Sequence, residues 1–129
     1  MNLLLDTCVF LWLMMDSKKI SPTLLEILSN PLNRRYLSSA SVWEIVVKCQ
    51  IGKLNLPKGP VEFLNETKTK GRIRPLPVEE AAILQLPKLP SLHNDPFDRM
   101  LICQAIESGM TIVTPDQLIE QYPIKTLWI

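Results

Sequence analysis

Residues 3–15, LLLDTCVFLWLMM, join a short apolar run, an aspartate and a second apolar run without interruption. The three leucines before Asp6 predict a strand buried on both faces, as parallel strands between layers of helices are. The apolar segment 9–15 then predicts a buried first helix. We therefore expect an α/β fold whose first strand ends at Asp6.

The rest of the chain continues the alternation of strands and helices. Helix starts are indicated by Ser41 with Glu44 three residues later, a capping box, and by Asp95 before Pro96. Alternation of this kind predicts a parallel sheet between helices, with right-handed crossovers that bring the carboxyl ends of all strands to one edge, where ligands bind. Further strands are predicted at residues 36–38, 73–76, 111–114 and 124–128, and helices at 21–30, 41–51, 60–70, 79–86, 96–109 and 115–121.

Composition limits the classes of protein to consider. With 129 residues, of which 47% are hydrophobic and 21% charged, the chain is expected to form one domain, residues 1–129. A net charge of +1 gives no overall field toward nucleic acid or membrane, so such binding needs local patches. The basic segments 34–35 and 68–74 are candidates, interpreted mainly as solvated faces and alternatively as contacts to backbone phosphates.

Cysteine and histidine content bears on location and metal class. The three cysteines are far apart and lie among apolar residues, which favours reduced thiols in a cytoplasmic protein. A single histidine, His93, excludes metal sites that need two. The apolar N-terminal run is too short for a membrane span and lacks the pattern of a signal peptide, so we expect no membrane association.

Four acidic residues follow predicted strands or begin predicted helices at the same edge of the sheet. Asp6 ends the first strand, Glu44 lies in the helix after the second strand, and Asp116 follows the fourth strand. Asp98 reaches this edge only if the loop at residues 87–94 brings its helix there. Carboxylates held close together are costly unless a cation neutralises them, and oxygen ligands select Mg²⁺ or Mn²⁺. Such a site suits attack of a metal-activated water on a phosphodiester.

Each acid also has a structural interpretation, because each stands where it could cap a helix or favour its dipole. The coincidence of four acids favours the site over capping, whereas Asp95 is interpreted as a cap. His93 is interpreted as a loop histidine rather than a ligand.

Four further residues flank the acids. Thr7 and Thr114 are candidates to orient waters or carboxylates from a second layer. Lys48 follows Glu44 by one helical turn and Arg99 follows Asp98 directly. For both cations, an ion pair with the neighbouring acid and a role in orienting a phosphate or carboxylate remain open.

The ordered set of motifs resembles PIN-domain ribonucleases of the VapC toxin type, the nuclease half of bacterial toxin–antitoxin pairs. The segments are LLLDT at 3–7, SASVWEI at 39–45, IGKLNLP at 51–57, HNDPFDRMLICQA at 93–105, TIVTPD at 111–116 and YPIKTLW at 122–128. Cys8 and Cys103 depart from the residues that relatives often have, histidine and alanine.

The resemblance implies a three-layer α/β/α fold with strand order 3-2-1-4-5 and a Mg²⁺- or Mn²⁺-dependent endoribonuclease. It implies an acidic, metal-binding site formed by Asp6, Glu44, Asp98 and Asp116. It further implies a homodimer and inhibition by a small antitoxin protein whose tail covers the acidic groove.

Other functions fit the residues less well. A receiver domain and a haloacid-dehalogenase-type phosphatase both need a second acid near Asp6, and Cys8 stands where the phosphatase needs it. Glycine-rich nucleotide motifs are absent from the sequence. The remaining alternative is a PIN-like module that binds RNA or protein without cleaving it.

Overall fold

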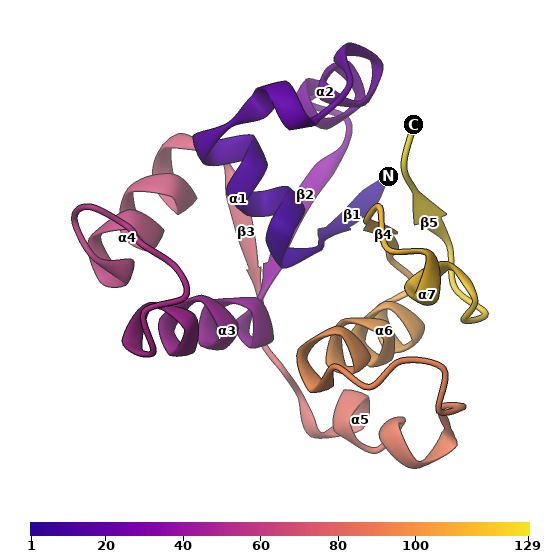
Figure 1. Cartoon of the computed structure of the whole chain (residues 1–129). Coiled ribbons are helices and arrows are strands. Elements are labelled where there is room, and N and C mark those ends of the chain that lie inside the picture. The colour runs from indigo at the N-terminus through magenta and orange to yellow at the C-terminus, as the bar shows by residue number, and fades with distance from the viewer.

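The computed structural model describes residues 1–129 and contains one five-stranded parallel sheet (Figure 1). The strand order β3-β2-β1-β4-β5 confirms the expected topology, with β1 in the centre. The strands are β1 (Asn2–Leu5), β2 (Arg34–Ser38), β3 (Ile73–Leu76), β4 (Thr111–Val113) and β5 (Thr126–Leu127).

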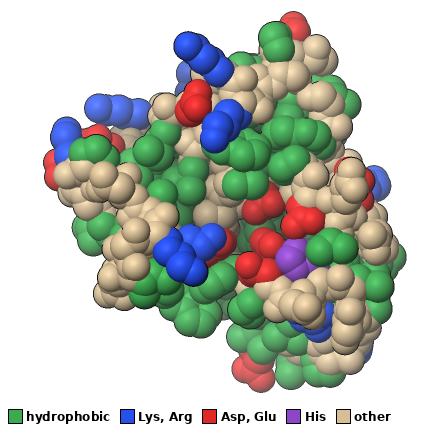
Figure 2. Space-filling model, in the orientation of Figure 1, with side chains coloured by type: hydrophobic (Ala, Val, Ile, Leu, Met, Phe, Trp, Pro, Cys, Tyr) green, Lys and Arg blue, Asp and Glu red, His purple; other side chains and the backbone are tan.

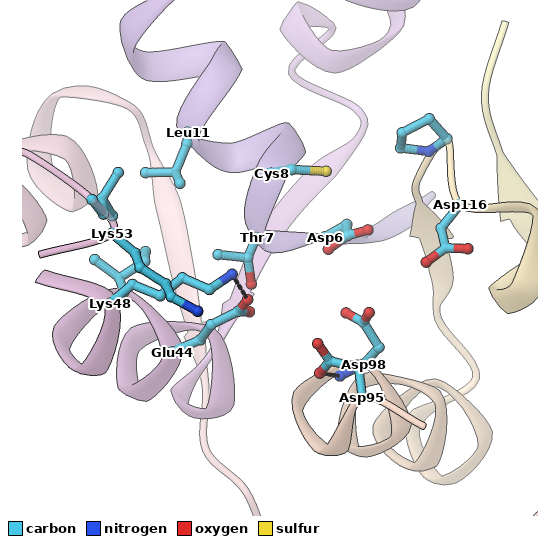
Figure 3. A pocket seen from close by; sticks show the side chains of 13 residues that line it. Asp6, Thr7, Cys8, Leu11, Glu44, Lys48, Lys53, Asp95, Asp98 and Asp116 are labelled. Atoms are coloured by element: carbon cyan, nitrogen blue, oxygen red, sulfur yellow. Dashed lines mark hydrogen bonds and ion pairs between the residues drawn. The ribbon is translucent and has the colours of Figure 1, made fainter. Parts of the chain in front are cut away.

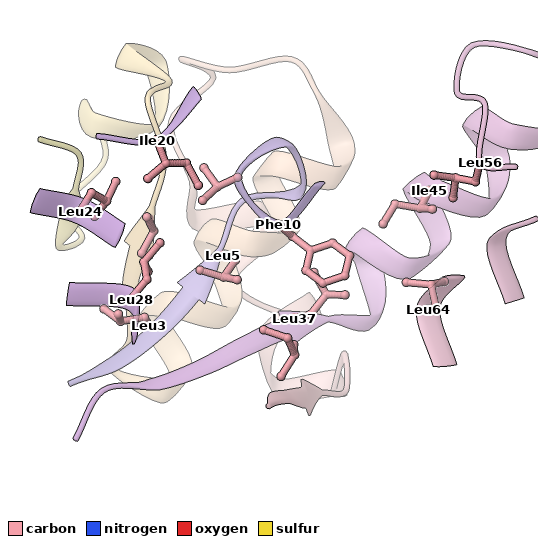
Figure 4. Close-up of a cluster of buried hydrophobic side chains, with 13 residues drawn as sticks. Leu3, Leu5, Phe10, Ile20, Leu24, Leu28, Leu37, Ile45, Leu56 and Leu64 are labelled. Carbon is pink, nitrogen blue, oxygen red and sulfur yellow. The ribbon is translucent and has the colours of Figure 1, made fainter. Parts of the chain in front are cut away.

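Helices cover both faces of the sheet, and the alternation of side chains along β1 joins the two layers. Leu3 and Leu5 pack in a core with residues of α1 to α4, whereas Leu4 packs on the opposite face with residues of α6 and α7 (Figure 4 shows the first core). Helix α5 packs against α6. The α-helices are α1 (Thr7–Met15), α2 (Pro22–Ser29), α3 (Ser39–Gln50), α4 (Pro60–Lys70), α5 (Glu80–Ile83), α6 (Pro96–Ser108) and α7 (Gln117–Glu120), and short 3₁₀ helices span Ser17–Lys19 and Leu86–Lys88. None of the helices combines the length and apolar character that a membrane crossing requires.

The start of α3 differs from the sequence prediction. The cap is Ser38 rather than Ser41, because β2 turns directly into the helix and the Ser38 hydroxyl accepts a hydrogen bond from the Ala40 N–H at 2.9 Å. Ser41 is buried inside the first turn, where its Oγ accepts a hydrogen bond from Thr7 Oγ1 at 2.9 Å. The predicted capping box of Ser41 and Glu44 is therefore wrong, and Glu44 is free of that role.

Two other predicted elements are shorter in the structure. The helix predicted at 79–86 is one turn, α5, followed by a 3₁₀ turn that includes Pro87, since proline cannot continue an α-helix. The last strand contains two residues instead of the predicted five and pairs only with β4.

The parallel register places the ends of β1 and β4 side by side. Leu5 is paired with Val113, and the backbone N–H of Asp6 donates to the Val113 carbonyl at 3.1 Å. The next residues, Asp6 and Thr114, therefore leave the sheet together at its carboxyl edge.

Candidate functional site

A cavity of about 440 Å³ lies at the carboxyl edge of the sheet and is lined by five carboxylates (Figure 3). Figure 2 shows acidic side chains gathered around this hollow, with the histidine beside them. The structure thus brings all four predicted acids to one cavity, including Asp98, whose helix begins beside the edge as the prediction required. The five are Asp6, Glu44, Asp95, Asp98 and Asp116.

Asp6 is one of the two buried acids of the cavity, with 6% of its surface exposed against 5% for Glu44. It occupies the N-cap position of α1, but its side chain makes no capping hydrogen bond. Instead, Thr114 Oγ1 donates to Asp6 Oδ2 at 2.6 Å. Burial raises the pKa of Asp6, the bond from Thr114 opposes this, and the charges of Glu44 and Asp116 raise it further. The Asp6 carboxylate therefore faces the cavity instead of capping α1, and it is held by Thr114. Their roles in a functional site stay predictions.

His93 lies between two of the acids. Its Nε2 is 2.9 Å from Asp116 Oδ2 and 3.1 Å from Asp98 Oδ2. Its Nδ1 accepts a hydrogen bond from the backbone N–H of Asp95 at 3.1 Å. Because Nδ1 uses its lone pair as an acceptor, the neutral ring carries its hydrogen on Nε2 and shares it between the two carboxylates.

The pKa values of the two carboxylates beside His93 are shifted in opposite directions. Burial, followed by the charges of Asp6 and Asp95, raises the pKa of Asp98 to about 7. Burial also acts to raise the pKa of Asp116, but hydrogen bonds from His93 and from the Leu118 N–H outweigh it and lower that pKa. Asp116 therefore has two roles, since its Oδ1 caps α7 through Leu118 while its Oδ2 faces His93.

Sequence reasoning missed His93 as a site residue, because its loop has no regular structure from which a direction can be predicted. Arg99 anchors that loop: its guanidinium donates to the Pro90 and His93 carbonyls at 3.2 and 3.4 Å and contacts the Tyr122 hydroxyl at 3.4 Å. Tyr122 accepts from the His93 N–H at 2.9 Å. Arg99 thus takes neither expected role: it forms no ion pair with Asp98 and does not line the acidic cavity. The available signal was the position of His93, two residues before the cap of α6.

Glu44 enters the cavity from α3 and has an unusual environment. One oxygen, Oε2, pairs with Lys48 Nζ at 2.5 Å, and this hydrogen bond raises the pKa of Lys48. The other oxygen, Oε1, is buried and has no hydrogen-bond partner. Lys53 lines the same cavity. Of the two roles left open for Lys48, the ion pair with Glu44 is present. The Thr7 hydroxyl contacts Ser41 rather than a carboxylate.

The donor set fits a hard divalent cation. A buried carboxylate oxygen without a partner and carboxylates with raised pKa values indicate negative charge that the protein itself does not neutralise. Ligand atoms of His93, Asp98 and Asp116 lie within 4.8 Å of one another, and Asp6 and Glu44 stand outside this group. Binding of one ion by all four acids stays a prediction. The hydrogen on Nε2 makes His93 a donor to the carboxylates rather than a ligand.

Known proteins resemble the chain in sequence family and in fold. The PIN domain family model matches residues 3–125. The VapBC2 complex of Rickettsia felis bound to a promoter DNA fragment has a chain with a TM-score of 0.75 at 17% identity, with all of both chains covered. DNA-bound VapBC from Salmonella typhimurium gives 0.72 at 17% identity, covering 98% of this chain and 97% of the other.

A third structure, VapBC-1 from nontypeable Haemophilus influenzae, gives a TM-score of 0.69 at 21% identity, with 98% and 97% covered. No curated protein matches the sequence significantly. The structural likenesses, all at low identity, concern the fold, whereas the family model spans nearly the whole sequence. With its strand order and its acidic cavity at the carboxyl edge, the chain belongs to the PIN domain family.

Proposed function

We propose that this chain is a metal-dependent endoribonuclease of the VapC toxin type, acting in the cytoplasm on RNA phosphodiester bonds. PIN domains are generally nucleases, which supports hydrolysis as the reaction class. The observation that supports the proposal most strongly is the cavity lined by five carboxylates, of which Asp6 and Glu44 are buried and Glu44 Oε1 has no hydrogen-bond partner. Asp6, Glu44, Asp98 and Asp116 would hold Mg²⁺ or Mn²⁺.

The ion, when bound, would lower the pKa of a water ligand and offset charge on the phosphate oxygens. The chain's own residues prepare the site for it. Thr114 fixes one oxygen of Asp6, and His93 holds Asp98 and Asp116 at a common donor. Release of Lys48 from Glu44 would make a cation available to a phosphate entering the cavity.

The proposed partners follow the complexes that share the fold. Those structures are VapBC toxin–antitoxin complexes, which supports a small antitoxin as a partner of this chain. We further propose a homodimer, which light scattering on the purified protein would test directly. RNA is the proposed substrate.

The test is cleavage of pooled total RNA by the purified chain with Mn²⁺, with EDTA, and with the variant Asp6→Asn. We expect cleavage only by the unchanged chain with Mn²⁺. The matched control is Asp16→Asn, which removes one exposed acid outside the cavity and should leave cleavage unchanged. Cleavage in EDTA, or by Asp6→Asn, would contradict the mechanism, and failure to cut any RNA would favour a binding module.

A further inference from the structure

Two basic segments that are far apart in the sequence meet in one hollow at the amino edge of the sheet. Arg34 and Arg35 begin β2, and Arg72 and Arg74 lie at the start of β3. The register pairs Arg35 with Ile73, so the beginnings of the two strands lie side by side. The hollow measures about 330 Å³, and Lys70 adds a fifth cation to its lining.

The charge of this basic hollow is not neutralised within the protein. None of the ten residues that line it is acidic, and none of its five cations forms an ion pair. The Arg35 guanidinium donates to the Gly71 carbonyl, and burial together with Arg72 lowers the pKa of Arg35. A concave surface lined by one sign of charge concentrates its field, so the hollow is strongly positive although the chain has a net charge of only +1.

The chemistry of the lining favours phosphate groups. Four of the five cations are arginines, whose planar guanidinium binds phosphate oxygens in pairs. Arg34, Arg72 and Arg74 are exposed and free to reorient toward a ligand. The two basic segments, interpreted from the sequence mainly as solvated faces, therefore form one positively charged surface whose side chains suit an anion.

The acidic cavity gives a reason for such a surface in a protein that acts on RNA. Carboxylates repel the phosphate backbone, so attraction has to come from other parts of the molecule. The strand β2 joins the two edges: Arg34 lies at the basic hollow, and Ser38, four residues or about 13 Å further along, begins the turn into α3 with Glu44. An RNA that contacts both edges would follow the surface of the protein around the sheet.

We propose that the basic hollow binds the phosphate backbone of RNA at a site separate from the acidic cavity. The proposal rests on the function proposed above and extends it with a second RNA contact. Contacts of this kind position the nucleic acid without reading its sequence. They weaken as the salt concentration rises, because the counterions that binding releases from the RNA then gain less entropy.

The test measures binding of a fluorescently labelled RNA hairpin of about 30 nucleotides in EDTA, where cleavage is not expected. The double variant Arg34→Glu with Arg74→Glu changes two exposed residues of the hollow. The control, Lys88→Glu with Lys125→Glu, makes the same change in net charge at exposed residues outside both cavities. We expect affinity to fall by about tenfold or more in the first variant and by less than about threefold in the control. The slope of log affinity against log salt should decrease by about 1–2 in the first variant only.

Several outcomes would overturn the proposal. Equal weakening in the two double variants would show an effect of net charge alone, and tighter binding of a duplex DNA of equal length would identify a different ligand. Melting by circular dichroism establishes that both variants fold, and the neutral pair Arg34→Gln with Arg74→Gln replaces the first variant if it does not.

The two proposals fail separately. If the hollow variant loses RNA binding and the unchanged chain cuts no RNA, the nuclease proposal fails and the proposed RNA contact at the hollow stands. If the unchanged chain cuts total RNA, and the hollow variant binds and cuts RNA as the control does, only the proposed RNA contact at the hollow fails.

Discussion

Replacement of Asp98 by asparagine is expected to stabilise the metal-free protein. The folded state holds the pKa of Asp98 at about 7 against an ordinary value of 3.8. Because the folded pKa is raised, the favourable contribution of this group is complete below pH 3.8 and is lost as the pH rises to about 7. A shift of about three pKa units corresponds to an upper limit of about 4 kcal/mol of destabilisation at pH 8.

The realistic effect is smaller, because the cavity is open to water and the Asp98 side chain is 15% exposed. Taking half of the limit, the Asp98→Asn variant should gain about 2 kcal/mol, or about 5–10 °C in melting temperature for a domain of this size. Differential scanning calorimetry in EDTA at pH 8 measures this gain. The gain should shrink as the pH falls and disappear near pH 4.

The control for this experiment is Asp95→Asn, which removes a charge nearby at a capping position where asparagine serves as well as aspartate. It should raise the melting temperature by less than Asp98→Asn does, because the charge of Asp95 is only one of several causes of the raised pKa of Asp98. With Mn²⁺ added, the unchanged chain should have the higher melting temperature of the two, because it gains more stability from the ion than Asp98→Asn does. A lower melting temperature of Asp98→Asn at pH 8, or a gain that is the same at pH 4, would refute the electrostatic argument.

Three further predictions concern neighbours of the acids. His93→Ala should weaken Mn²⁺ binding by about 10–100-fold, measured by paramagnetic resonance, whereas His93→Gln keeps a donor and should lose much less; equal losses would contradict the role of Nε2. Thr114→Val should lower the free energy of unfolding in urea by about 1–3 kcal/mol. It should also move the pH midpoint of Mn²⁺ binding upward, because the hydrogen bond from Thr114 lowers the pKa of Asp6 and its loss lets that pKa rise. Thr114→Ser is the control. Burial and the charges of Asp6 and Asp98 raise the pKa of Cys8 to about 12, so iodoacetamide at pH 8 should label Cys8 slowly and label it faster in Asp6→Asn, as followed by mass spectrometry.

The sequence predicted the elements whose pattern is local. The apolar run before Asp6 and the prolines and glycines at helix ends were sufficient for most boundaries. The strand order followed only from the resemblance to PIN-domain ribonucleases. The exact start of α3 was not predictable, because Ser38 and Ser41 are both good caps and only the distant partners decide. The Ser38 hydroxyl donates a hydrogen bond to Gln104 Oε1 at 2.5 Å, and the Ser41 hydroxyl accepts one from Thr7.

The gathering of the acids in one cavity was predictable, because the carboxyl ends of parallel strands meet at one edge of the sheet. The environment of His93 and Arg99 was not, because a loop has no periodicity from which directions follow. Trp43 on α3 is 64% exposed and packs edge-on against Phe97 at 5.1 Å between ring centroids.

The backbone of the loop that places His93 is held by side-chain hydrogen bonds from Arg99 and to the Tyr122 hydroxyl rather than by pairing within a sheet. Asp6, by contrast, follows the central strand, whose leucines are fully buried on both faces. Thermal fluctuation is therefore distributed unevenly over the site: a detachment of this loop would displace His93 and loosen the start of α6 while Asp6 and Thr114 stay in place. Hydrogen exchange should detect this as early deuteration of the His93 amide against a late Asp6 amide.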